Sequence, residues 1–166
     1  GTPGNEDTVY LELKKKFDGV VYKRRASMKY EDARKYLYDG IRLETDSQIL
    51  KEIDYALRRY QARPAVYLAY ERIAFLGKEN PELRITFDMD IRARRYDVEL
   101  DKGSYGTVFL DKGMFLMEVK IPGAMPVWMS RVFSELGIYP VSYSKYGTFY
   151  QDYVAEETEG GEEACA

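Results

Sequence analysis

TVYLELKKKFDGVVYKRR, residues 8–25, is the stretch that decides the fold. It contains two runs typical of β-strands, Thr8–Lys16 and Val20–Arg25, separated by Phe17-Asp18-Gly19. A glycine-containing connection of about three residues between such runs predicts a β-hairpin. Apolar and charged residues alternate along both runs, and residues two apart share a face of a strand. The hairpin is therefore expected to have one apolar face and one charged face.

Further along the chain, the pattern predicts helices and strands in blocks rather than in βαβ alternation. Two helices are expected first, at 27–38 and from Asp46 or Ser47 to a point before Pro64. Strand-like runs then cover 65–76, 83–94, 107–110 and 114–121, and two more helices are expected at 125–136 and 142–154. This order is typical of the α+β class built on an antiparallel sheet.

Each long strand has a face that carries charged groups of both signs. The charged positions are Glu12, Lys14, Lys23, Arg72, Arg84, Asp88, Glu118 and Lys120. One interpretation is a sheet with a solvated polar face. The other is a sheet that curls into a partial tunnel or barrel, covered by helices, with a charged lumen. Lysines and arginines crowded in a lumen repel one another, so a lumen would require a polyanion. Its acids could hold Mg²⁺ or Mn²⁺, which prefer carboxylate oxygens.

Composition limits the catalytic chemistry that is possible and predicts the cellular compartment. The 166 residues suit one domain, and no histidine is present, which excludes imidazole-based catalysis. The single cysteine, the lack of a signal peptide and the lack of a long apolar span predict a cytoplasmic protein without a membrane segment. The net charge is −3, but the five glutamates after Ala155 account for it, because the preceding residues sum to +2. We expect residues 1–7 and the acidic tail 155–166 to be disordered.

Five segments in order resemble a known family. They are YLELKKKFDGVVYKRR (10–25), YLAYERIAF (67–75), ELRITFDMDIRARR (82–95), MFLMEVKIPGAMPVWM (114–129) and SYSKYG (142–147). Together they are similar to the VTC (vacuolar transporter chaperone) domain of polyphosphate polymerases, a member of the triphosphate tunnel metalloenzymes, which are CYTH-like. The resemblance covers residues 8–154. It also implies that strands which open the family's domain are missing, so that the tunnel is incomplete.

The resemblance implies roles for particular residues. Lys14, Lys23, Arg72, Arg84, Lys120 and Lys145 match the basic residues that contact phosphates in the tunnel, and they are our candidate catalytic residues. Arg72, Arg84 and Lys120 would hold the phosphates of a nucleotide or of polyphosphate. Glu118 matches the metal-binding glutamate, with Glu12 and Asp88 as supporting acids, and the metal would be Mn²⁺ or Mg²⁺.

The implied activity is phosphoryl transfer from ATP to a polyphosphate chain. Two alternatives stay open: a tunnel-type hydrolase of triphosphate compounds, and a non-catalytic module that binds polyphosphate or phosphate. The sixteen tyrosines beside basic residues are compatible with nucleic-acid binding. We do not expect that function, because no nucleic-acid-binding motif accompanies them.

Overall fold

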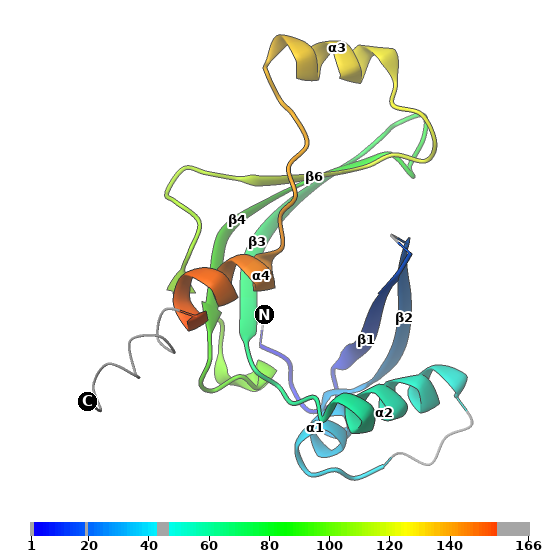
Figure 1. Cartoon of the computed structure of the whole chain (residues 1–166), viewed down its shortest axis with the longest axis vertical. Helices are drawn as coiled ribbons and strands as arrows, with labels where there is room; N and C mark the ends of the chain where they lie inside the picture. The colour runs from blue at the N-terminus through cyan, green and yellow to red at the C-terminus, as the bar shows by residue number, and fades with distance from the viewer. Residues whose placement is uncertain (1, 19, 43–46, 156–166) are drawn as a thin grey trace. The chain divides into compact units, whose positions relative to one another are not determined.

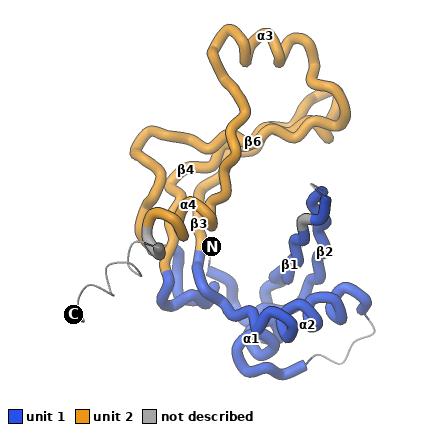
Figure 2. The backbone as a smooth tube through the Cα atoms, in the orientation of Figure 1, with its two compact units in different colours: residues 1–67, 95–104 blue, residues 68–94, 105–166 orange. Residues whose placement is uncertain are grey.

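A computed structural model describes residues 2–18, 20–42 and 47–155, which belong to two compact units (Figures 1 and 2). The first unit comprises Gly1–Tyr67 and Arg95–Ser104, and the second comprises Leu68–Arg94 and Tyr105–Ala166. The first contains β1 (Thr8–Phe17), β2 (Val20–Lys29), α1 (Tyr30–Tyr38), α2 (Gln48–Tyr60) and the 3-10 helix η1 (Leu100–Lys102). The second is built on β3 (Tyr67–Leu76), β4 (Arg84–Arg94), β5 (Thr107–Val108), β6 (Leu116–Lys120), α3 (Val127–Glu135), α4 (Lys145–Phe149) and the π-helix η2 (Tyr150–Ala155).

The first unit is organised by a long antiparallel hairpin. β1 pairs with β2 over ten residues in each strand, from Thr8 opposite Lys29 to Phe17 opposite Val20. The connection is shorter than the sequence predicted, because Phe17 is already paired. Asp18 enters the turn at a φ of 47°, a left-handed conformation that Asp tolerates well. This tight turn keeps the register, and the register decides which side chains share a face.

Helices α1 and α2 pack against this hairpin. α1 buries Tyr30, Ala33 and Tyr36, which lie three residues apart on one side of the helix. α2 begins where the sequence predicted, because the Ser47 Oγ accepts a hydrogen bond from the Leu50 amide at 3.4 Å. α1 begins later than predicted, since the pairing of β2 continues through Ser27 to Lys29 and Ser27 therefore does not cap the helix.

The second unit contains a four-stranded sheet in which β4 has neighbours on both sides. β3 lies beside β4, while β6 and β5 pair antiparallel with successive parts of β4. Arg84–Asp88 pair with β6, and Arg92–Ala93 pair with β5. Asp90 lies between these two parts with a φ of 48°, so β4 is locally irregular where its partner changes.

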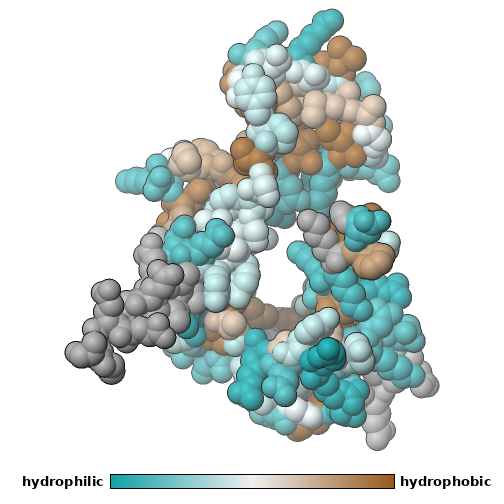
Figure 3. All heavy atoms as spheres, viewed as in Figure 1, coloured by the Kyte–Doolittle hydropathy of each residue, from teal (hydrophilic) through white to brown (hydrophobic). Residues whose placement is uncertain are grey.

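The buried apolar side chains of the second unit come from β4, α3 and α4. Ile91, Ala93, Met129 and Phe149 are buried, and the rings of Phe149 and Phe109 are 5.5 Å apart. α3 buries Met129 but leaves Trp128 and other apolar side chains exposed, and hydrophobic atoms are visible over α3 at the top of Figure 3.

The α+β class with antiparallel strand pairs is confirmed. The described strands form one two-stranded and one four-stranded sheet, and no closed barrel is found among them. The curled tunnel is therefore not confirmed and stays a prediction. The predicted strands 107–110 and 114–121 are shorter in the structure, and the predicted helix 142–154 is split into α4 and η2.

Ile91→Ala tests the core of the second unit. The side chain of Ile91 is fully buried, so its truncation leaves a cavity and should cost about 2–5 kcal/mol of unfolding free energy in a urea titration. Ile73→Ala is the matched control, because Ile73 is 50% exposed on β3 and its loss should cost less than about 1 kcal/mol. Equal costs for the two variants would contradict this account of the core.

Candidate functional site

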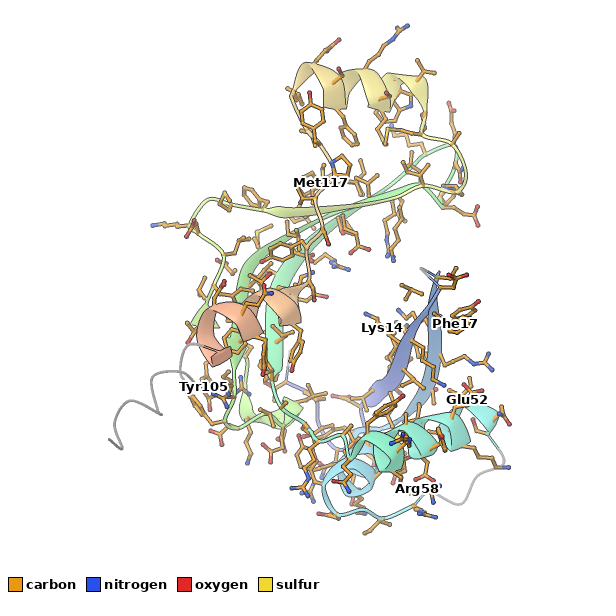
Figure 4. The ribbon with its side chains drawn as sticks, viewed as in Figure 1. Lys14, Phe17, Glu52, Arg58, Tyr105 and Met117 are labelled. Atoms are coloured by element: carbon orange, nitrogen blue, oxygen red, sulfur yellow. The ribbon has the colours of Figure 1, made fainter. Side chains whose placement is uncertain are left out.

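The charged face of the hairpin gathers one acid and three cations. In an antiparallel pair, residues directly opposite each other share a face. Glu12 lies opposite Arg25 and Lys14 opposite Lys23, and these four residues form what we call the hairpin cluster. Lys14 projects from β1, as Figure 4 shows.

Glu12 holds the hairpin cluster together. Its carboxylate lies 2.7 Å from the Lys23 Nζ, 2.8 Å from the Arg25 Nη2 and 3.4 Å from the Lys14 Nζ. Hydrogen bonds from Lys23 and Arg25 lower the pKa of Glu12 from its ordinary value of 4.5 to about 2. The carboxylate is thus ionised at neutral pH and reduces the repulsion among three cations, and the cluster keeps an excess of positive charge.

The second unit has its own charged face, defined by the pairing of β4 with β6. Arg84 lies opposite Lys120, and Thr86 lies opposite Glu118, so these four residues share one face with Asp88. Met117, labelled in Figure 4, alternates with Glu118 and lies opposite Phe87 on the other face.

Five charged side chains of the second unit form a continuous ionic network, which we call the Asp88 cluster. They are Lys145, Asp88, Arg72, Glu118 and Lys120. The Lys145 Nζ is 2.7 Å from the Asp88 Oδ2. Arg72 donates to both carboxylate oxygens of Asp88, from Nε at 2.5 Å and from Nη2 at 2.8 Å. Glu118 lies 3.7 Å from the Arg72 Nη2 and 3.4 Å from the Lys120 Nζ. Signs alternate along the network, which begins and ends on a cation.

Asp88 is the buried centre of this network, with a fully buried side chain. Burial by itself would raise the pKa of Asp88, but hydrogen bonds from Arg72 and Lys145 outweigh burial and lower the pKa below 3.8. The same hydrogen bond raises the pKa of Arg72. Asp88 and Arg72 are therefore both charged at neutral pH.

Arg84 differs from Arg72 in having its guanidinium unused. It neighbours Lys120 across the β4–β6 pair, and no acid or hydrogen-bond acceptor among the described residues engages its side chain. Glu118 is the ionic partner of Lys120, so these two cations share a single acid, and the excess positive charge would favour an anion.

The structure thus brings together most of the residues that the sequence singled out, within each unit. Arg72, Arg84, Asp88, Glu118, Lys120 and Lys145 gather in the second unit, and Glu12, Lys14 and Lys23 gather on the hairpin. Their chemical roles stay predictions.

Sequence reasoning missed three participants. Arg25 contacts Glu12, Tyr70 lies under Arg72 and Lys145, and Thr86 has a buried hydroxyl without a hydrogen-bond partner in the described part of the chain. Strand alternation could have found the first two, because Arg25 is two residues from Lys23 and Tyr70 is two residues from Arg72.

The carboxylates differ in how available they are to a metal ion. Glu12 and Asp88 are each engaged by at least two cations at short range, whereas Glu118 is 43% exposed and has longer ionic contacts. Among the described residues, no group of three or more His, Cys, Asp or Glu side chains is placed to hold a metal ion. Of these three acids, Glu118 is consequently the one least engaged by cations.

Comparison with protein families shows the family of this chain. A family model described as VTC domain matches residues 2–153. The chain belongs to the VTC domain family. No match was found among curated proteins.

Membership of the VTC family supports a polyphosphate-related role in general. The cation-rich faces of this VTC domain are consistent with such a role, because polyphosphate carries a high density of negative charge. No helix in the described ranges is both long enough and apolar enough to span a membrane.

The pH dependence of stability tests the hairpin cluster. Glu12 has a pKa of about 2 in the folded chain against an ordinary 4.5, so its stabilising effect is complete above pH 4.5 and is lost as the pH falls toward 2. The melting temperature of the wild-type chain should exceed that of Glu12→Gln at pH 7, and the difference should close on acidification through this window. Glu79→Gln, outside the cluster, should show no such closing difference. A pH-independent difference for Glu12→Gln would contradict the assignment.

Proposed function

We propose that this VTC domain contributes a phosphate-binding surface to a polyphosphate polymerase, which transfers the γ-phosphate of ATP to a growing polyphosphate chain. The observation that carries the proposal is the guanidinium of Arg84, which no acid in the described part of the chain engages, on the face that also bears Lys120 and the Asp88 cluster. Four cations and two carboxylates gather there, which leaves a net charge of +2 for an anionic ligand.

The geometry supports a role for each group. Arg84 offers a planar fork of donors that suits the oxygens of phosphate, and Lys120 offers a compact positive charge next to it. Lys145 and Arg72 enlarge the positive region on the side of Asp88. The hairpin is a separate cation-rich face of the first unit, where Lys14 and Lys23 would bind phosphate in their own right, since Glu12 neutralises only part of their charge.

For phosphoryl transfer, the protein has mainly to position the phosphates and to stabilise their negative charge. An oxygen of the terminal phosphate of the chain would form a bond to the γ-phosphorus, while the bond from that phosphorus to the β–γ bridging oxygen breaks and ADP leaves. The attacking oxygen is already anionic, so no general base is needed, in agreement with a chain that has no histidine. Fixed cations would stabilise the charge that moves between the two phosphates.

Glu118 is the residue that we propose for a divalent cation. A bound Mn²⁺ or Mg²⁺ would supply further neutralisation of phosphate oxygens. Glu118 would hold it while Lys120 and Arg72, both near its carboxylate, face the same phosphates.

Tripolyphosphate binding to this chain tests the proposal. At about 100 times its dissociation constant, the ligand should stabilise the fold by roughly 2.7 kcal/mol, seen as a rise of several degrees in melting temperature at about 0.15 M salt. Arg84→Ala should reduce the rise, because it removes the unengaged donor fork. Arg131→Ala on α3 is the matched control and should leave the rise intact. No rise in the wild-type chain, or the same rise in Arg84→Ala, would contradict the proposal.

Metal dependence tests the assignment of Glu118. Adding Mn²⁺ should increase the tripolyphosphate-induced rise in melting temperature, and Glu118→Gln should abolish that increase while keeping the metal-free rise. The reason is that an amide of the same size is a poor ligand for a hard cation. Mn²⁺-dependent conversion of ATP into polyphosphate by the protein should fall by orders of magnitude in Glu118→Gln. An unaltered Mn²⁺ effect would exclude Glu118 as a ligand, and Glu135→Gln serves as the control variant.

The product of an incubation with ATP and Mn²⁺ separates the possible activities. Long polyphosphate supports the polymerase, free phosphate alone points to a hydrolase, and binding without turnover points to a binding module.

A further inference from the structure

Asp88 is a buried acid at the junction of three elements. Its side chain, on β4, is fully buried, and it contacts Arg72 from β3 and Lys145 from the first turn of α4. The α4 end that carries Lys145 is itself fixed, since the Ser144 Oγ accepts a hydrogen bond from the Gly147 amide at 3.1 Å. Asp88 thus connects the helix to two strands through charged hydrogen bonds.

The contacts of Asp88 determine which edge of Arg72 is available. A guanidinium has five N–H donors in a rigid plane. The Nε and Nη2 atoms of Arg72 both donate to Asp88, at 2.5 and 2.8 Å, so that edge of the plane is occupied. The Nη1 group has no such contact to Asp88. Because the guanidinium is a rigid plane and its Nε/Nη2 edge is bonded to a buried carboxylate, the direction of the Nη1 group is fixed as well.

Tyr70 restrains the same two cations from a different side. The Arg72 guanidinium lies 5.1 Å and the Lys145 ammonium 4.7 Å from the centroid of the Tyr70 ring. Both distances are within the range of cation–π attraction. Arg72 is one-third exposed and Lys145 is 19% exposed, so both reach the surface although the acid that holds them does not.

We propose that Asp88 is a positioning residue, which orients the Nη1 edge of Arg72 and the ammonium of Lys145 toward polyphosphate without touching the ligand itself. This proposal rests on the proposed function. It assigns Asp88 a role other than supporting a metal, because both of its oxygens are already engaged by cations. It also explains why two cations can stand close together, since the carboxylate between them offsets their repulsion.

A double-mutant cycle separates positioning from a general effect on stability. Isothermal titration calorimetry would measure the dissociation constant of tripolyphosphate for the wild-type chain, Arg72→Ala, Asp88→Asn and the double variant. In the wild-type background, Arg72→Ala should weaken binding by about tenfold or more. In the Asp88→Asn background, the same change should weaken binding by less than about threefold, since an unheld Arg72 contributes little.

The matched control removes a negative charge from the other face of β3. Glu71 is exposed and precedes Arg72, so its side chain alternates with that of Arg72. In a Glu71→Gln background, Arg72→Ala should keep its full effect. Equal effects of Arg72→Ala in the wild-type and Asp88→Asn backgrounds would overturn the positioning role while leaving the proposed function intact. An absence of tripolyphosphate binding to the wild-type chain would overturn both.

If Asp88→Asn does not fold, hydrogen exchange in the protein that keeps Asp88 tests the proposal instead. The Nε–H proton of Arg72, assigned by its loss in Arg72→Ala, should exchange with water more slowly than that of exposed Arg131, because it is bonded to a buried oxygen. It should stay protected when tripolyphosphate saturates the protein. Loss of protection on binding would mean that Arg72 leaves Asp88 to contact phosphate, and the proposal would be wrong.

Discussion

Cations gathered on one face of a sheet repel one another. In each unit of this protein, one carboxylate that contacts several of them offsets this repulsion. Glu12 contacts three cations on the hairpin, and Asp88 contacts two in the second unit. Each acid neutralises only part of the charge around it. Both faces therefore keep an excess of positive charge.

The two acids differ in their surroundings, and the difference matters for chemistry. Glu12 lies on a two-stranded hairpin and keeps 20% of its side chain exposed, so water screens its ion pairs. Asp88 is fully buried, where directed hydrogen bonds are stronger and an unmatched charge is costly. The ion pairs of Asp88 are accordingly less screened by water than those of Glu12. Glu118, half-exposed at the edge of that network, is left as the acid with capacity for a further partner.

Much of the secondary structure could be predicted from local signals. The hairpin, the Ser47 cap of α2 and the strand 84–94 follow from alternation and capping. Ser27 misled the prediction for α1, because a serine is a good cap only where the chain has left the strand, and here β-pairing continues past it. The irregularity at Asp90 could not be predicted from local sequence signals either, since it arises where β4 changes its partner from β6 to β5.

The sequence by itself determined which side chains share a face of each strand, because alternate residues of an extended chain point to opposite sides. That was enough to select Lys14, Lys23, Arg72, Arg84, Glu118 and Lys120, and the family motifs added Lys145. Only the tertiary structure decided that Asp88 holds Arg72 and Lys145 while no acid among the described residues engages Arg84. The reason is that strand pairing and the docking of α4 set distances between residues far apart in the chain, and no local pattern encodes which acid meets which cation.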